Sequence, residues 1–164
     1  MITVALVGAG GKMGCRITDN MKKQKDYRIL HVEVAEAGRR RLEERGVAPV
    51  AAEEALPVAD LVVLAVPDNR IEAVSKTLTP QMRDGGLLVC LDPAAPCAGR
   101  VTVRPEVPCF VVHPCHPPVF GDETDPEAQR DFFGGIKAKQ HIVCALVQGG
   151  DDDYARGEAL AWAM

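Results

Sequence analysis

Short apolar runs alternate along the chain with stretches in which apolar residues recur every three or four positions. The runs are typical of strands, and a run without a polar position, such as residues 61–66, is typical of a strand buried on both faces of a sheet. Strands are predicted at residues 2–7, 27–33, 48–50, 61–66, 87–91, 109–112 and 141–147.

Helical periodicity fills the intervals between these runs. The apolar faces of two predicted helices are marked by Met13, Ile17 and Met21 and by Ile71, Val74 and Leu78. Helices are also predicted over residues 36–45 and 154–164, and a short helical turn over residues 52–55. The alternation of strands and helices predicts an α/β fold, a Rossmann-like, doubly wound and mostly parallel sheet.

The first predicted strand ends in a cluster of glycines that leads into a helix. Two spacings are present: G-x-x-G-x-x-G, and the dinucleotide-binding motif G-x-G-x-x-G with one residue inserted. Glycine allows backbone N–H groups to approach a phosphate, and the helix N-terminus adds its unpaired N–H groups and positive dipole end. We therefore predict a nucleotide cofactor bound by Gly8, Gly10, Gly11, Lys12, Met13 and Gly14.

Glu33 ends the second predicted strand, about 20 residues beyond the last motif glycine. An acidic residue at that position is typical of binding to the ribose hydroxyls of NAD, and its charge would repel the 2′-phosphate of NADP. The arginines at 39–41 would reverse this preference if one of them reached the ribose, but solvated positions on the next helix are the favoured interpretation. NAD is therefore the predicted cofactor.

Further cofactor contacts are predicted where other strands end. Val66, Pro67 and Asp68 follow the fourth predicted strand, where backbone commonly packs against a dinucleotide. Asp68 is equally suited to be the N-cap of the next helix, and the cap is the favoured interpretation. Asp92, after the fifth predicted strand, either binds a ribose or substrate hydroxyl or caps its turn.

Candidate catalytic groups follow the sixth predicted strand, in the proline-rich segment 113–120. His113 and His116 are held among prolines, which favours a rigid site. They suit a metal centre, acid–base chemistry on a substrate hydroxyl, or a merely structural strand exit, and all three interpretations stay open. In residues 132–141, Lys137 and Lys139 could contact a substrate carboxylate or an enolate, although solvated lysines are the commoner outcome.

Composition excludes several classes of partner. The net charge of −4 and the lack of a basic run beyond residues 39–41 argue against nucleic acid and acidic membranes. No apolar stretch approaches the ~20 residues of a membrane span, and we expect no signal peptide because the sequence enters a predicted strand at once. Scattered cysteines, of which Cys90, Cys109 and Cys144 are interpreted as reduced core residues, favour a cytoplasmic location.

The end of the chain predicts a domain boundary. Residues 1–148 are expected to form the NAD-binding domain, and residues 149–164 to begin a helix that leads into a missing helical C-terminal domain. The acidic residues 151–153 are typical of a helix N-terminus. The sequence offers this helix no C-cap and no evident packing partner, which favours truncation.

Together, Gly8–Gly14, Glu33 and residues 65–68 and 91–96 resemble the N-terminal domain of 6-phosphogluconate dehydrogenase-like and β-hydroxyacid dehydrogenase-like proteins. The segment 113–120 with 132–141 resembles a bacterial branch of that family with a phosphogluconate-dehydrogenase-type C-terminal domain, which includes the D-apionate oxidoisomerases. The resemblance implies a two-domain, homodimeric NAD enzyme that oxidises and rearranges a branched or polyhydroxylated sugar acid.

For the site, the resemblance implies that His116, or His113 as second choice, polarises the new carbonyl. A divalent metal at His116 would serve the same purpose and would need further ligands. Lys139, from the residue pattern alone, is a further catalytic candidate. Two alternatives remain: a regulatory module that binds NAD without catalysis, and a dihydrodipicolinate-reductase-like enzyme. The rigid histidine segment favours the enzyme over the sensor.

Overall fold

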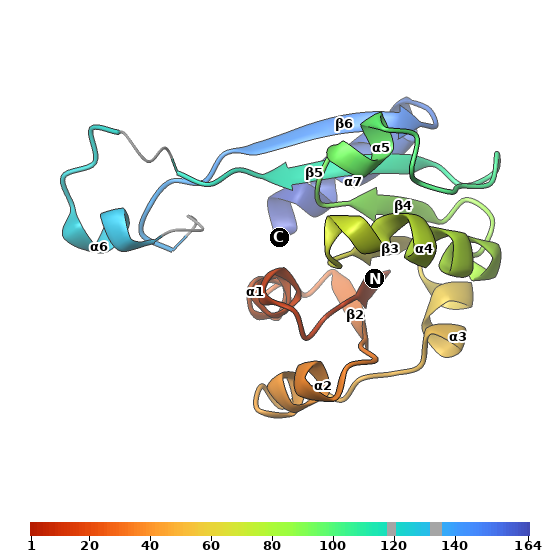
Figure 1. Ribbon diagram of the computed structural model, residues 1–164, viewed down its shortest axis with the longest axis horizontal. Helices are drawn as coiled ribbons and strands as arrows, with labels where there is room; N and C mark the ends of the chain where they lie inside the picture. The colour runs from red at the N-terminus through yellow and green to blue at the C-terminus, as the bar shows by residue number, and fades with distance from the viewer. Residues whose placement is uncertain (118–120, 132–135) are drawn as a thin grey trace.

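A computed structural model describes residues 1–117, 121–131 and 136–164 of the chain. One sheet of six strands runs through the molecule in the order β2-β1-β3-β4-β5-β6 (Figure 1). The strands are β1 (Ile2–Val7), β2 (Tyr27–Val32), β3 (Leu61–Leu64), β4 (Leu87–Cys90), β5 (Cys109–Pro114) and β6 (Ile142–Gln148). The first five are parallel to one another, and β6 pairs antiparallel with β5 at the edge.

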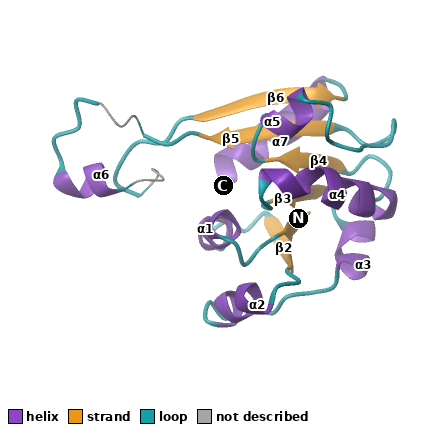
Figure 2. Ribbon diagram, viewed as in Figure 1, coloured by secondary structure: helices purple, strands orange, loops and turns teal. Residues whose placement is uncertain are grey.

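Helices cover both faces of this sheet, so the predicted doubly wound, mostly parallel architecture is confirmed (Figure 2). The longer helices are α1 (Lys12–Met21), α2 (Glu36–Glu43), α4 (Asp68–Leu78) and α7 (Asp151–Ala163). Shorter ones are α3 (Ala52–Ala55), α5 (Ala94–Cys97) and α6 (Pro126–Arg130), with 3₁₀ turns η1 (Leu56–Val58) and η2 (Thr79–Gln81).

Two apolar clusters form the core, one on each face of the sheet. On one face, β strands pack against Ile17 of α1, Leu42 of α2 and Leu160 of α7, all essentially buried. On the other, they pack against side chains of α3, η1, α4 and α5, including Ile71 of α4. Strands β3 and β4 are buried at every position, as the all-apolar runs predicted.

The predicted strand at residues 48–50 is wrong. Val50 makes only an isolated parallel bridge with Val32, through a hydrogen bond from its N–H to the His31 carbonyl oxygen. Pro49, in the middle of the segment, has no N–H to add to a ladder, which limits the pairing. The predicted bounds of β1 and α3 match the structure, and the other predicted strands and helices differ from it by one to three residues at their ends. Cys144 is only half-buried, although the sequence pattern placed it in the core.

Helix α7 has a packing partner, contrary to the prediction from sequence. Gly157 lies against the ring of Phe110 in β5, and Tyr154 makes an edge-to-face contact with the same ring at 5.4 Å between centroids. Arg156 donates to the carbonyl oxygens of Gly85 and Asp60, which ties α7 to the loops before β4 and β3. The helix lies on the sheet because its buried face is apolar, a relationship that the sequence pattern of so short a segment could not specify.

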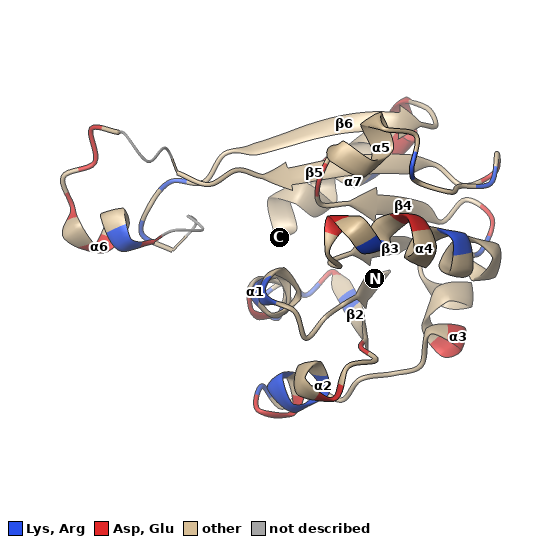
Figure 3. Ribbon diagram, in the orientation of Figure 1, with Lys and Arg blue, Asp and Glu red and all other residues tan. Residues whose placement is uncertain are grey.

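Strands β5 and β6 run on into an extended arm that carries α6 away from the body of the molecule (Figure 1). Residues 118–120 and 132–135, which belong to the two candidate segments of the sequence, lie outside the described residues. Acidic and basic side chains are interspersed over helices and loops, and the strands carry few (Figure 3). Among the described helices, none has the length and apolarity needed to cross a bilayer.

Candidate functional site

A cleft of about 370 Å³ opens where the carboxyl ends of the parallel strands meet the start of α1. This is the edge at which open α/β sheets bind ligands. Its walls come from the glycine loop, from the segments after β3 and β4, and from β5 and the loops beyond it. It is lined by Gly11, Lys12, Met13, Ala65, Val66, Pro67, Asp68, Leu91, Asp92, His113, Pro114, His116 and Gln140.

The glycine loop itself has few N–H groups to offer a ligand. Those of Gly8 and Ala9 both donate to the Val32 carbonyl oxygen, at 2.9 and 3.3 Å. That of Gly11 donates to the Gly8 carbonyl oxygen at 2.9 Å, and that of Gly10 donates to a carboxylate described below. The loop is therefore closed on itself and on β2.

The unpaired N–H groups lie one step further along, in the first turn of α1. Gly11 is the N-cap, with extended backbone and no side-chain cap. Within the described part of the chain, the N–H groups of Lys12, Met13 and Gly14 have no hydrogen-bond partner. Three such N–H groups, at the positive end of a helix dipole, have the chemistry to donate hydrogen bonds to the oxygens of a phosphate, so the predicted phosphate contact stays a prediction here.

At each glycine of the motif, nearby backbone atoms restrict the space that a side chain would need. Gly8 has φ +78°, and a Cβ there would lie 2.5 Å from the Ala65 carbonyl oxygen. A Cβ at Gly14 would collide with the Gly8 carbonyl, and one at Gly10 with the backbone of Gly38 in α2. Gly11 is the least crowded of the four, although a Cβ there would still lie in tight contact with the Gly8 carbonyl oxygen, at 3.2 Å, and it faces the cleft. Gly8, Gly10 and Gly14 thus shape the site, whereas Gly11 leaves space in it.

Glu33 connects the glycine loop to the end of β2 through hydrogen bonds from its carboxylate. Its side chain is buried, and one carboxylate oxygen, Oε2, accepts the Gly10 N–H at 2.9 Å while Oε1 accepts the Ala35 N–H at 2.8 Å. A Cβ on Gly38 would lie 2.5 Å from the carboxylate carbon, so α2 sits directly on it. The predicted contact of Glu33 with a ribose stays a prediction; the contacts present are with backbone.

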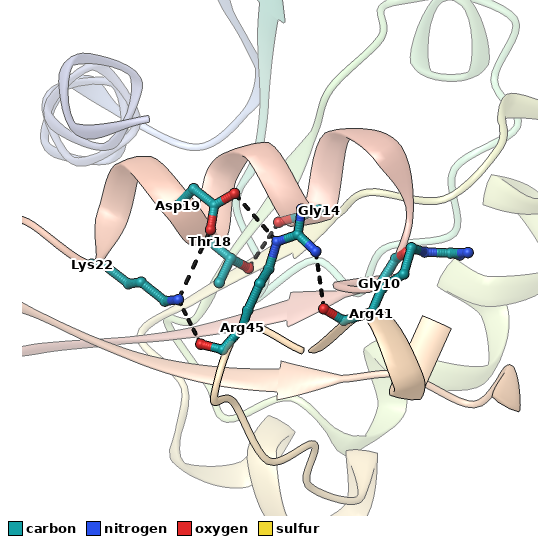
Figure 4. A network of polar contacts seen from close by, with 7 residues as sticks. All are labelled: Gly10, Gly14, Thr18, Asp19, Lys22, Arg41 and Arg45. Atoms are coloured by element: carbon teal, nitrogen blue, oxygen red, sulfur yellow. Dashed lines mark hydrogen bonds and ion pairs between the residues drawn. The ribbon is translucent and has the colours of Figure 1, made fainter. Parts of the chain in front are cut away.

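Arginines of α2 complete the attachment. Arg41 Nε donates to the Gly10 carbonyl oxygen at 2.6 Å, so both backbone polar groups of Gly10 are held (Figure 4). Arg39 Nε donates to the Glu33 carbonyl oxygen at 2.9 Å, and Arg40 pairs with Glu36 on the exposed side of α2.

Arg45 continues this network toward α1. Its guanidinium donates to the Arg41 carbonyl oxygen and pairs with Asp19 of α1 at 3.2 Å (Figure 4). The same Asp19 also pairs with Lys22, whose ammonium donates to the Arg45 carbonyl oxygen at 2.8 Å. The two helices that flank the glycine loop are thereby linked through exposed polar groups.

On the opposite wall of the cleft, His113 of β5 meets the segment after β4. Its Nδ1 lies 3.1 Å from the Leu91 carbonyl oxygen and 3.7 Å from Asp92 Oδ2. Asp92 Oδ1 accepts the Ala94 N–H at 2.7 Å. Asp92 therefore caps its turn, one of the two predicted roles, and also lines the cleft.

The other predicted site residues are distributed unevenly. His116 lines the cleft together with Gln140, whereas Lys139 is exposed and does not line it. Lys137 forms an ion pair with Glu127 of α6 at 2.9 Å. Within residues 1–117, 121–131 and 136–164, no three His, Cys, Asp or Glu side chains are grouped as a metal site would require.

Asp68 lines the cleft but is not the N-cap of α4, as the sequence suggested. The cap is Pro67, in extended backbone without a side-chain hydrogen bond, and Asp68 is the first helical residue. The ring of Pro67 fixes its φ at a value compatible with the extended conformation of an N-cap. The helix therefore begins at Asp68, one residue earlier than it would if Asp68 were the cap.

Four lining residues were absent from the predicted site: Ala65, Leu91, Pro114 and Gln140. Ala65 and Leu91 lie at the ends of apolar runs and line the cleft without a polar side chain, so their residue types do not mark them as site residues. Pro114 adjoins His113 and could have been included by adjacency. Gln140 reaches the cleft only because the arm returns beside β5, a long-range relationship without a local motif.

Two family models divide the chain. Residues 2–121 match the NADPH-binding domain of acetohydroxy acid isomeroreductase. The chain belongs to this family. Residues 121–164 match the C-terminal domain of decarboxylating phosphogluconate dehydrogenase, so the resemblance inferred from the sequence is confirmed at family level.

Curated relatives carry one name. D-apionate oxidoisomerase from Cupriavidus necator is 52% identical over 159 residues, covering 96% of this chain and 57% of the relative. The protein of the same name from Rhizobium rhizogenes is 48% identical, covering 99% of this chain and 60% of the relative. The chain thus spans somewhat more than half the length of these relatives.

Solved structures agree with the fold. A semialdehyde dehydrogenase NAD-binding protein from Cupriavidus necator, in complex with calcium and NAD, superposes with a TM-score of 0.90 at 50% identity, covering 99% of this chain and 59% of that one. A ketol-acid reductoisomerase from an uncultured archaeon superposes with a TM-score of 0.70 at 18% identity, covering 99% of this chain and 49% of that one. The second comparison supports the fold alone.

Proposed function

We propose that this chain is the cofactor-binding part of an NAD-dependent oxidoisomerase acting on a small branched sugar acid, with D-apionate as the substrate to test. One observation carries the proposal: a single cleft joins the uncapped N–H groups of α1 to the histidines at the end of β5. The relatives named D-apionate oxidoisomerase support this choice of reaction and substrate. A sensor would need the first half of the cleft but not the second.

The residues present suit a dinucleotide. The first turn of α1 would hold the pyrophosphate through the N–H groups of Lys12 and Met13, and Gly11 leaves the space that a side chain would fill. Val66 and Pro67, after β3, would pack against the cofactor on the way to the histidines. The bound cofactor would supply the hydride acceptor, and the histidine wall would manage the hydroxyl proton.

We further propose that NAD is preferred to NADP. The negative charge of Glu33 lies at the end of β2, where it opposes a second phosphate. Arg39 and Arg41, which could favour NADP, are already committed through their Nε atoms to the backbone of Glu33 and Gly10. The matched family is described as NADPH-binding, whereas the 50% identical structure from Cupriavidus necator contains NAD.

A divalent cation at His116 is a separate prediction. The similar structure from Cupriavidus necator contains calcium. In the part of the chain that the structure describes, His116 is not accompanied by two further ligands, so a cation there would need donors from elsewhere. Turnover measured before and after chelation tests this point independently of the cofactor.

The proposed function is tested with the full-length protein. Isothermal titration calorimetry with NAD⁺ and NADP⁺ measures cofactor binding, and absorbance of NADH measures turnover of D-apionate. We expect binding of NAD⁺ in preference to NADP⁺, and NADH formation that depends on D-apionate. Binding without turnover on D-apionate and related sugar acids would favour the sensor; no binding of either nucleotide would overturn the proposal.

Three organisational features are proposed with it: a boundary at residue 148/149, a homodimer and a cytoplasmic location. The side chain of Trp162 is 85% exposed on α7 while the opposite face of that helix is buried, which supports a contact of Trp162 with a further domain or subunit. Light scattering of the full-length protein measures the oligomeric state.

All six cysteines are free thiols, which supports a reducing compartment.

A further inference from the structure

The hydrogen bond between His113 and Leu91 fixes the imidazole tautomer. A backbone carbonyl oxygen can only accept, so the Nδ1 atom of His113, 3.1 Å away, must carry the proton. The other ring nitrogen, Nε2, is then the lone-pair nitrogen of the neutral ring. Within the described part of the chain, Nε2 has no hydrogen-bond partner, and the ring lines the cleft.

The carboxylate of Asp92 lies on the Nδ1 side of this imidazole. Its Oδ2 lies 3.7 Å from the same Nδ1, and its other oxygen is held by the Ala94 N–H at 2.7 Å. The side chains of His113 and Asp92 are 40% and 31% exposed, so both reach the cleft without being buried in it. A carboxylate beside Nδ1–H orients the ring and stabilises the imidazolium that forms when Nε2 takes up a proton.

The two anchoring groups come from a neighbouring strand. Leu91 and Asp92 directly follow β4, and His113 is in β5, which is parallel to β4 and hydrogen-bonded to it. The carboxyl ends of these strands are thus side by side, and the orientation of the ring is set by regular sheet structure. His116, by contrast, lies in the loop after β5.

We propose that His113, through Nε2, is the general base that accepts the substrate hydroxyl proton, with Leu91 and Asp92 as its positioning residues. The inference rests on the proposed function and changes the order of candidates suggested by the sequence, where His116 came first. In the step, the O–H bond breaks and its proton goes to Nε2. The C–H bond breaks as hydride goes to NAD⁺, and the carbon–oxygen double bond forms.

The tautomer is tested without any turnover. Nitrogen-15 NMR of the histidine rings, with His113 assigned by the signals lost in His113→Asn, distinguishes Nδ1–H from Nε2–H. We expect the Nδ1–H form at a pH where the ring is neutral. A dominant Nε2–H form would overturn the proposal whether or not D-apionate is the substrate.

Turnover is tested with His113→Asn, whose amide can still donate to Leu91 but has no atom in place of Nε2. General-base catalysis contributes about 10²–10⁴-fold, so we expect kcat on D-apionate to fall at least 100-fold while NAD⁺ affinity stays within about threefold. The matched control is His141→Asn, an exposed histidine that does not line the cleft. A kcat of His113→Asn close to that of the control would overturn the proposal.

The pH profile separates the base from a merely structural histidine. The other charged or titratable residues that line the cleft are Lys12, Asp68, Asp92 and His116. We expect wild-type kcat/KM to fall on the acid side as His113 is protonated, and His113→Asn to lose that limb. Asp92→Asn, which keeps an oxygen for Ala94 but loses the charge beside Nδ1–H, should lower kcat less than His113→Asn does. An unchanged limb in His113→Asn would contradict the assignment, whereas a wild type inactive on D-apionate would instead refute the proposed substrate.

Discussion

The Gly10 N–H donates a buried hydrogen bond of 2.9 Å to the Glu33 carboxylate, and this bond joins the glycine loop to the end of β2. A carboxylate at this position is usually considered for its contact with a ribose. Here both of its oxygens already accept backbone N–H groups. The same residue that would select the cofactor therefore also shapes the loop that we propose lies against it.

The double role of Glu33 is tested with Glu33→Ala. Removal leaves the Gly10 N–H without its acceptor, at a cost of about 1–3 kcal/mol. We expect the free energy of unfolding to fall by that amount, NAD⁺ affinity to fall about tenfold or more, and discrimination against NADP⁺ to weaken. Urea denaturation and calorimetry with both nucleotides measure these effects.

The control for this prediction is Glu36→Ala, three residues after Glu33, which removes an exposed carboxylate paired with Arg40. A surface pair of this kind contributes about 0–1 kcal/mol. If Glu33→Ala behaves like this control in both measurements, the buried bond to Gly10 has no part in shaping the loop.

The glycine motif offers one position at which ligand binding can be separated from folding. Gly11 has extended backbone, φ −72° and ψ 173°, and a Cβ there would meet the Gly8 carbonyl oxygen at 3.2 Å, a tight contact that a small shift relieves. Gly11→Val should leave the free energy of unfolding within about 1 kcal/mol of wild type and lower NAD⁺ affinity about 100-fold or more, because the side chain enters the phosphate site. Calorimetry on material with a native circular dichroism spectrum is the measurement.

Gly150→Val is the matched control, since Gly150 is the N-cap of α7 with nothing within 4 Å of a Cβ. We expect that variant to bind NAD⁺ normally. Gly14→Val, which the motif alone would suggest as an equivalent probe, should instead unfold the loop, because its Cβ collides with the Gly8 carbonyl. Normal NAD⁺ affinity in folded Gly11→Val would remove the first turn of α1 as the phosphate site.

The sequence allowed the sheet, and the position of the glycine turn at the cleft, to be predicted because those features are local. An all-apolar run such as residues 61–66 indicates a strand covered on both faces, and a glycine turn between a strand and a helix indicates a phosphate site. The steric reasons that distinguish Gly11 from its neighbours depend on contacts with Ala65 and Gly38, which no local pattern contains.

The histidine wall was predicted only in part, for the same physical reason. The pattern identified His113 and His116 as candidates, but their ranking depends on Leu91 and Asp92, which lie about twenty residues earlier and meet β5 only across the sheet. The packing of α7 on Phe110 is likewise a long-range relationship.

The packing of α7 gives a prediction with an unusual sign. In an exposed helix interior, Gly→Ala stabilises by about 0.5–1 kcal/mol. At Gly157 the new methyl group would collide with the Phe110 ring, so Gly157→Ala should destabilise by about 1–3 kcal/mol. The free energy of unfolding from urea titration decides the sign, and a stabilised variant would mean that α7 does not rest on β5.

His31 gives the fold a dependence on acidity. Burial in β2, and secondarily the charge of Lys22, lowers the pKa of this imidazole from 6.5 to about 4, and its Nε2 has no partner among the described residues.

Between pH 6.5 and about pH 4, the pKa values of His31 in the unfolded and the folded chain, the unfolded chain binds more protons than the folded one. Stability should therefore be unaffected above pH 6.5 and should decline as the pH falls toward 4, by about 3 kcal/mol in total. His31→Leu should remove most of this decline, which urea titrations at pH 7.5, 5.5 and 4.5 would measure. The exposed control His141→Leu should retain it, and a His31→Leu protein that still lost stability as steeply as wild type would assign the acid sensitivity to other groups.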